Sequence, residues 1–99
     1  MPWNLQFSKA IGGYRPVNIS GGENAIIAYV KAIITADSVS RYDSGAFKRL
    51  EIPFTAITHD GFHAVEINEY TRVVRYSPEV RGAKYIAQEL QKHINSVTG

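Results

Sequence analysis

The sequence contains no cysteine, which excludes disulfide bonds, thiolate zinc sites and a cysteine nucleophile. Chains without cysteine are common among cytoplasmic proteins, and we expect that location here. No apolar run reaches the roughly 18 residues that a membrane-spanning helix needs. The first residues also lack the charged segment and apolar run of a secretory signal. The sequence therefore predicts a cytoplasmic protein without a membrane partner.

Charge of either sign is also scarce. There are 11 Lys and Arg residues and 9 Asp and Glu residues, so the formal net charge at pH 7 is only +2. A segment dedicated to nucleic acid would be much more basic. Hydrophobic residues make up 44% of the chain, which is enough for one modest core. We therefore expect residues 1–99 to form a single domain.

Residues 48–76 have the alternating pattern of antiparallel strands. Asp60 and Gly61 separate two β-rich runs, and both residue types tolerate the positive φ of a type I′ hairpin turn. A two-residue loop makes His59 face Phe62, and it also makes Ala56 face Val65. One face of the hairpin is then apolar, as expected for a half-covered sheet: Leu50, Ile52, Phe54, Ala56, Val65 and Ile67.

The strands on either side of this turn are less well defined. Pro53 cannot donate a backbone hydrogen bond, so it predicts an edge strand or a bulge. A weaker turn at Asn68 and Glu69 leads into a last strand over 70–76. A two-residue loop there turns Tyr70, Arg72, Val74 and Tyr76 toward the core, whereas one more residue turns Thr71, Val73 and Arg75 inward.

The N-terminal third predicts more sheet. Residues 3–7 alternate as a strand does, and residues 14–19 predict a second, less regular one. Residues 24–36 fit two structures. The spacing Ser20-x-x-Glu23 matches a helix capping box, but the many β-branched residues favour a strand. We interpret 24–36 as a strand and residues 37–47 as a long exposed loop.

Residues 77–97 have the clearest helical pattern. Ser77, Pro78 and Glu79 suit the first positions of a helix. The apolar residues that follow repeat at helical spacing: Val80, Ala83, Ile86, Ala87, Leu90, Ile94 and Val97. The predicted fold class is α+β, with an antiparallel sheet of four to six strands covered on one face by this C-terminal helix.

Two histidines near the hairpin turn raise the question of a metal site. His59 and His63 lie close to Asp60 and Glu66, and zinc is held by such ligands. In a two-residue hairpin, however, His59 and His63 point to opposite faces, with His63 at the end of the core face beside Thr58. We therefore expect no metal and no cofactor.

The same residues provide the ingredients of a small hydrolase or a ribonuclease-like toxin. His63 or His59 could act as a base, with Glu66, Arg72 or Arg75 as partners. Nothing in their spacing is specific for catalysis, and surface charges on a sheet would look the same. We therefore predict no enzymatic activity and keep the hydrolase as a minor alternative.

Basic and aromatic residues gather near the last strand and the start of the helix. Such residues can neutralise phosphates and stack on bases. Acidic residues are interleaved with them, which weakens the nucleic-acid interpretation. The candidate residues for a weak nucleic-acid-binding surface are Tyr70, Arg72, Arg75, Tyr76, Arg81 and Lys84.

Self-association is the partner that the sequence favours. A strand over 24–36 would be apolar on both faces, and both would need cover. A second copy of the chain is the simplest cover, which predicts a homodimer that buries Ile27, Tyr29 and Ile33. The preferred function is thus a small non-catalytic interaction protein, with nucleic-acid binding as the alternative.

Replacing Gly61 with Val tests the hairpin turn. A β-branched residue resists positive φ, so the free energy of unfolding should fall by roughly 1–2 kcal/mol or more. Urea unfolding measures this change. A variant as stable as the wild type would contradict the assigned turn.

Overall fold

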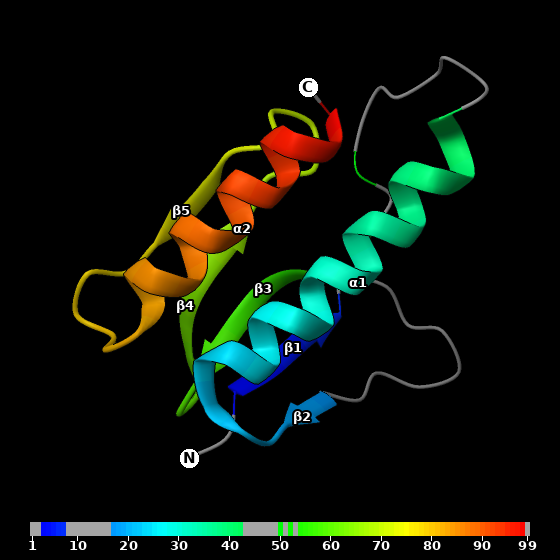
Figure 1. Cartoon of the computed structure of the whole chain (residues 1–99). Helices are drawn as coiled ribbons and strands as arrows, with labels where there is room; N and C mark the ends of the chain where they lie inside the picture. The colour runs from blue at the N-terminus through cyan, green and yellow to red at the C-terminus, as the bar shows by residue number, and fades with distance from the viewer. Residues whose placement is uncertain (1–2, 8–16, 43–49, 51, 53, 99) are drawn as a thin grey trace.

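The computed structural model describes residues 3–7, 17–42, 50, 52 and 54–98. The elements follow the order β1 (Trp3–Phe7), β2 (Val17–Ile19), α1 (Gly22–Tyr42), β3 (Phe54–His59), β4 (Phe62–Ile67), β5 (Val74–Tyr76) and α2 (Ala83–Thr98). The five strands form one antiparallel sheet in the order β2-β1-β3-β4-β5. Both helices lie on the same face of it (Figure 1). The predicted α+β class, the strand number and the C-terminal helix on the sheet are confirmed.

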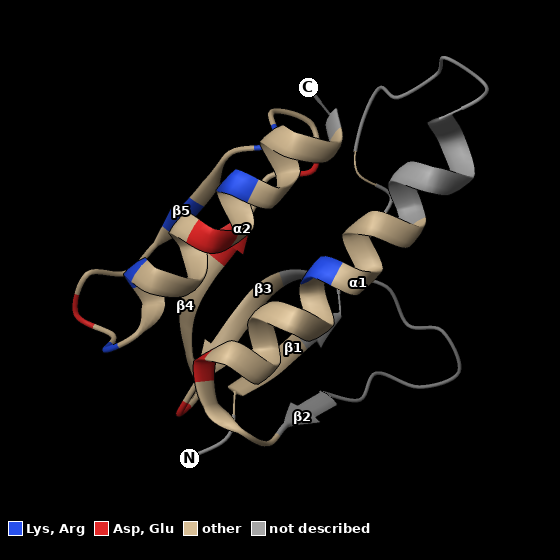
Figure 2. Ribbon diagram, in the orientation of Figure 1, with Lys and Arg blue, Asp and Glu red and all other residues tan. Residues whose placement is uncertain are grey.

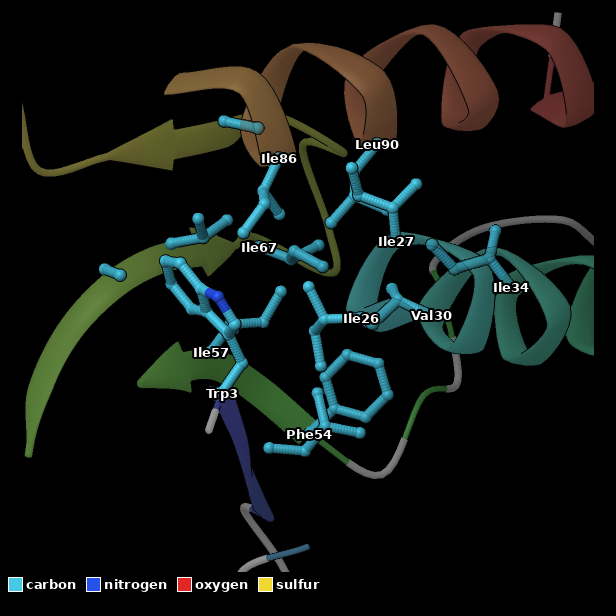
Figure 3. Close-up of a cluster of buried hydrophobic side chains, with 14 of the residues drawn as sticks. Trp3, Ile26, Ile27, Val30, Ile34, Phe54, Ile57, Ile67, Ile86 and Leu90 are labelled. Atoms are coloured by element: carbon cyan, nitrogen blue, oxygen red, sulfur yellow. The ribbon is translucent and has the colours of Figure 1, made fainter. Parts of the chain in front are cut away.

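The hydrophobic core fills the space between the sheet and the two helices (Figure 3). Trp3 and Ile57 contribute from the sheet, Ile26 from α1, and Ile86 and Leu90 from α2, each no more than 2% exposed. Burying one such side chain stabilises the fold by about 1.5–3 kcal/mol. Because one sheet face carries most of these residues, both helices are drawn to that face.

The β3–β4 hairpin has the predicted turn. Asp60 has a φ of 54° and Gly61 a φ of 81°, so both central residues are left-handed as a type I′ turn requires. His59 faces Phe62, as expected. A side chain at Gly61 would meet no atom within 4 Å. Any cost of a substitution there therefore comes from the backbone conformation.

Further along the hairpin the predicted register is wrong. A register shift lies between Ile57 and Thr58, so Val65 faces Ile57, and Ala56 faces Glu66 instead of Val65. Ala64 is the extra residue on β4, as in a β-bulge. The bulge lets Ala64 and Val65, which are neighbours in the sequence, both be buried.

The edge position predicted for β3 is wrong, because β3 lies between β1 and β4. The bulge that was predicted as the alternative agrees with the register shift between Phe54 and Ala56, which face Phe7 and Gln6 of β1. Pro53 lies outside the described residues, and the strand begins at Phe54, just after it. Leu50 and Ile52 precede the strand but are buried, at 0% and 6% exposure. The two sheet edges are β2 and β5, of three residues each.

Residues 24–36 belong to α1, so the strand interpretation is wrong. Ile26, Val30 and Ile34 are spaced by one helical turn, and all three are 0% exposed. A β-branched residue costs a helix up to about 0.7 kcal/mol, less than burial of its side chain returns. The helix also runs on to Tyr42, so the predicted loop over 37–47 is wrong as far as the chain is described.

The C-terminal helix begins later than predicted, at Ala83 rather than near Ser77. Residues 77–82 form turns, in which the N–H of Val80 donates to the carbonyl of Ser77 at 3.1 Å. Gly82 has a φ of 90°, which interrupts any helix that starts before it. The core positions Ile86 and Leu90 are confirmed at 0% exposure.

Polar side chains line the outer side of the contact between α1 and α2. Thr35 Oγ1 and His93 Nε2 are 2.8 Å apart, and Lys31 Nζ lies 3.9 Å from Glu89 Oε1. Partial burial, followed by the nearby charge of Lys31, lowers the pKa of His93 below its ordinary value of 6.5. Protonating His93 therefore opposes the folded state.

The stability of the chain should decline as the pH falls below about 6.5, because the unfolded state then binds a proton that the folded state resists. Urea unfolding at a series of pH values between 8 and 5.5 measures the effect. His93→Gln keeps a polar partner for Thr35 but does not titrate, so it should lose less stability over this range. Equal losses of stability in the wild type and in the variant would contradict the assignment of this pH dependence to His93.

Candidate functional site

In the described part of the chain, no helix covers the sheet face away from α1 and α2, which we call the open face. Asn4, Thr58 and His63 occupy neighbouring register positions there, and Glu66 lies directly opposite Arg75. A hollow of about 470 Å³ lies at the β4–β5 end of this face. Its lining residues are Ala56, His63, Glu66, Ile67, Asn68, Thr71, Val73 and Arg75.

The hollow brings together three residues that the hydrolase interpretation needs. His63 Nδ1 is 3.6 Å from Glu66 Oε1, and no carboxylate of the described chain lies within 4 Å of Arg75. His63 could move a proton with Glu66 orienting its ring, and Arg75 could hold an anion. The two partners are open to solvent, however, with side-chain exposures of 49% and 63%. Water-screened groups of this kind are poorly suited to catalysis.

The two histidines of the hairpin lie on opposite faces, as predicted. The ring of His59 is 4.4 Å from the buried ring of Trp3, on the helix side of the sheet. His63 is on the open face, so placing it at the end of the core face was wrong. No group of three His, Asp or Glu residues that could hold a metal ion occurs among the described residues.

The predicted nucleic-acid residues do not form one compact patch. Tyr70 and Arg72 lie in the loop before β5, and Arg81 and Lys84 lie beyond its other end. Along β5 itself the side chains alternate between faces, so Arg75 points to the open face and Tyr76 to the helix side. The basic residues instead follow one side of the molecule along β5 and the start of α2 (Figure 2).

The predicted self-association residues are split by the helical structure. Ile27 is 6% exposed, and Ile33 is partly buried against the core. Tyr29 is 41% exposed. The helix therefore buries Ile27 and leaves Tyr29 and part of Ile33 accessible, and self-association stays a prediction.

The exposed side of α1 is a feature that the strand interpretation missed. The only charged residues among the described side chains of α1 are Glu23 and Lys31, neither fully exposed (Figure 2). Ala28, Ala32 and Ala36 are exposed. Their spacing of four residues is visible in the sequence as one face of a helix. This alanine pattern can be read from the sequence, but it marks an exposed helix face only if residues 24–36 are assigned to a helix.

Comparisons of the chain with protein-family models, with curated proteins and with solved structures found no match. Among the described residues, no helix has the length and apolar character needed to cross a membrane.

Proposed function

We propose that the chain is a small non-catalytic interaction protein, and that the exposed side of α1 binds another protein chain. We call this surface the α1 face; it consists of Ala28, Tyr29, Ala32 and Ala36. The observation that carries the proposal is the lack of any charged side chain among these exposed residues. A surface helix normally carries charged and polar residues on its outer side.

The second helix provides an internal comparison. Its exposed positions are polar or aromatic throughout, namely Lys84, Tyr85, Gln88, Lys92, Asn95 and Ser96. Both helices pack on the same sheet face, so their outer sides meet the same solvent. The difference in composition is therefore not explained by packing on the sheet, and it supports a partner on α1.

The chemistry of the α1 face suits a protein partner. Alanine side chains allow another backbone to approach closely, and a half-exposed Tyr29 provides a rigid aromatic anchor of the kind enriched at interfaces. A second copy of the chain is the first partner to test, because two-fold dimers are the commonest assemblies. A different protein would use the same residues.

The double substitution Tyr29→Glu and Ala32→Glu should abolish binding at the α1 face, because it would bury unpaired carboxylates in the interface. Light scattering coupled to gel filtration reports self-association, and affinity capture after nuclease treatment reports other partners. Gln88→Glu, on the exposed side of α2, is the matched control and should retain both. The proposal would be contradicted if the wild type, the double variant and the control had the same mass and captured the same proteins.

Nucleic-acid binding is a second candidate, favoured by one observation. In the described chain, Arg75, Arg81 and Lys84 have no carboxylate within 4 Å, so their charges are available to phosphates. The open face carries no exposed aromatic side chain among its described residues, so it lacks a surface on which bases could stack. Binding on the open face would therefore be electrostatic and insensitive to sequence.

If the second candidate holds, affinity for DNA or RNA should fall steeply with salt. Arg81→Ala and Lys84→Ala should each reduce the slope of log affinity against log salt by about one. Lys92→Ala is the control, because Lys92 is paired with Glu89 at 3.2 Å. Fluorescence anisotropy with labelled single-stranded and double-stranded probes measures the slopes, and intact probes afterwards would argue against hydrolysis. No binding at low salt would remove this candidate.

A further inference from the structure

The free edge of β5 has a defined hydrogen-bonding pattern. The N–H of Ser77 donates to Ala64 at 2.9 Å, and the carbonyl of Val73 accepts from Asn68 at 3.0 Å. Backbone groups of alternate residues point to opposite sides of a strand. The backbone groups of residues 73, 75 and 77 therefore face β4, whereas those of Val74 and Tyr76 face away from the sheet. The carbonyl of Arg72 also faces away, although the N–H of Arg72 donates to the carbonyl of Asn68 at 2.8 Å.

Gln91 of α2 occupies half of this free edge. Its Oε1 accepts from the N–H of Val74 at 2.8 Å, and its Nε2 donates to the carbonyl of Arg72 at 2.9 Å. Its second amide hydrogen goes to Asn95 Oδ1 at 3.1 Å. A residue of a parallel strand bonds to two alternate residues of its neighbour in the same way. The side chain thus takes the place of one residue of an added strand.

We propose that the β5 edge is a strand-pairing surface for a second copy of the chain, and that Gln91 holds this edge closed in the free protein. An antiparallel pair centred on Val74 has a two-fold axis, as a symmetric dimer requires. The N–H of Val74 then donates to the carbonyl of the partner's Val74, and the N–H of Tyr76 donates to the carbonyl of the partner's Arg72. The N–H of Val74 and the carbonyl of Arg72, which Gln91 holds in the free protein, each gain a backbone partner in this pair.

The side chains in this register are compatible. Tyr76, which is 41% exposed, comes opposite the partner's Arg72. Val73, which is 46% exposed, comes opposite the partner's Arg75 on the open face. No two like charges meet directly across the pair, which would oppose it. The pairing joins two sheets into one and covers apolar surface at the edge.

This inference is independent of the α1 face, which lies over the other half of the sheet. The element contacts place α1 against β1 and β2, and α2 against β4 and β5. A dimer through β5 should therefore survive the substitutions of Tyr29 and Ala32. A dimer lost with those substitutions would belong to the α1 face instead.

The decisive variant is Gln91→Ala, which removes the competing amide. It should lower the dimer dissociation constant at least about tenfold, because pairing no longer requires breaking the bonds to Arg72 and Val74. Sedimentation velocity over a concentration series measures the constant. Gln88→Ala, at an exposed position on the same helix, is the matched control and should leave it unchanged.

A second substitution identifies the edge. Val74→Pro removes the outward N–H without touching the bonds to β4, and proline is accepted on an edge strand. Added to Gln91→Ala, it should return the chain to a monomer. A dimer that persists in the double variant would exclude β5 as the interface.

Hydrogen exchange on the wild-type chain gives a readout that needs no variant to fold. The N–H of Tyr76 has no partner among the described residues, so it should exchange quickly in the monomer and slow down as the concentration rises. A Gln91→Ala variant that stays monomeric, together with Tyr76 exchange that is independent of concentration, would overturn the proposal. Gln91 would then only tie α2 to β5.

Discussion

The burial of two helices on one sheet face is the interaction on which the rest of the structure depends. Ile26 and Val30 of α1 and Leu90 of α2 are 0% exposed, and they meet Leu5 and Ile57 of the sheet, which are also 0% exposed. At about 1.5–3 kcal/mol for each side chain, this layer outweighs the helix propensities of the residues in it. The core lies on one side of the sheet only. The open face, the two sheet edges and the outer sides of the helices are therefore not needed to form it.

The bulge in β4 shows how this one-sided core shapes the surface. One extra residue, Ala64, lets two consecutive residues be buried and moves His63 to the open face. There His63 meets Glu66 at 3.6 Å, beside Arg75 on the next strand. The polar cluster of the hollow thus results from a local packing adjustment, and the side chains of His63 and Glu66 in it are open to solvent.

Two surfaces remain that a packed monomer does not explain. The α1 face lacks charge, whereas the equivalent side of α2 is polar. The β5 edge is half closed by the side-chain amide of Gln91. An uncovered strand edge invites pairing with another chain, so a side chain that bonds to its backbone groups controls access to it. Both features support the proposal that the chain contacts other protein chains.

The sequence by itself determined the local features of this fold. Asp60 and Gly61 specified the hairpin turn, because few residues adopt positive φ, and the spacing of Ile86, Leu90 and Ile94 specified a helix.

Tertiary structure alone decided that 24–36 is helical, because its apolar residues satisfy both periodicities and only the available sheet face selects one. It also decided the register beyond the turn, and with it the residues of the hollow, since a bulge depends on packing across strands. The bonds of Gln91 to β5 join residues 17 and 19 positions apart, and no local pattern in the sequence encodes them.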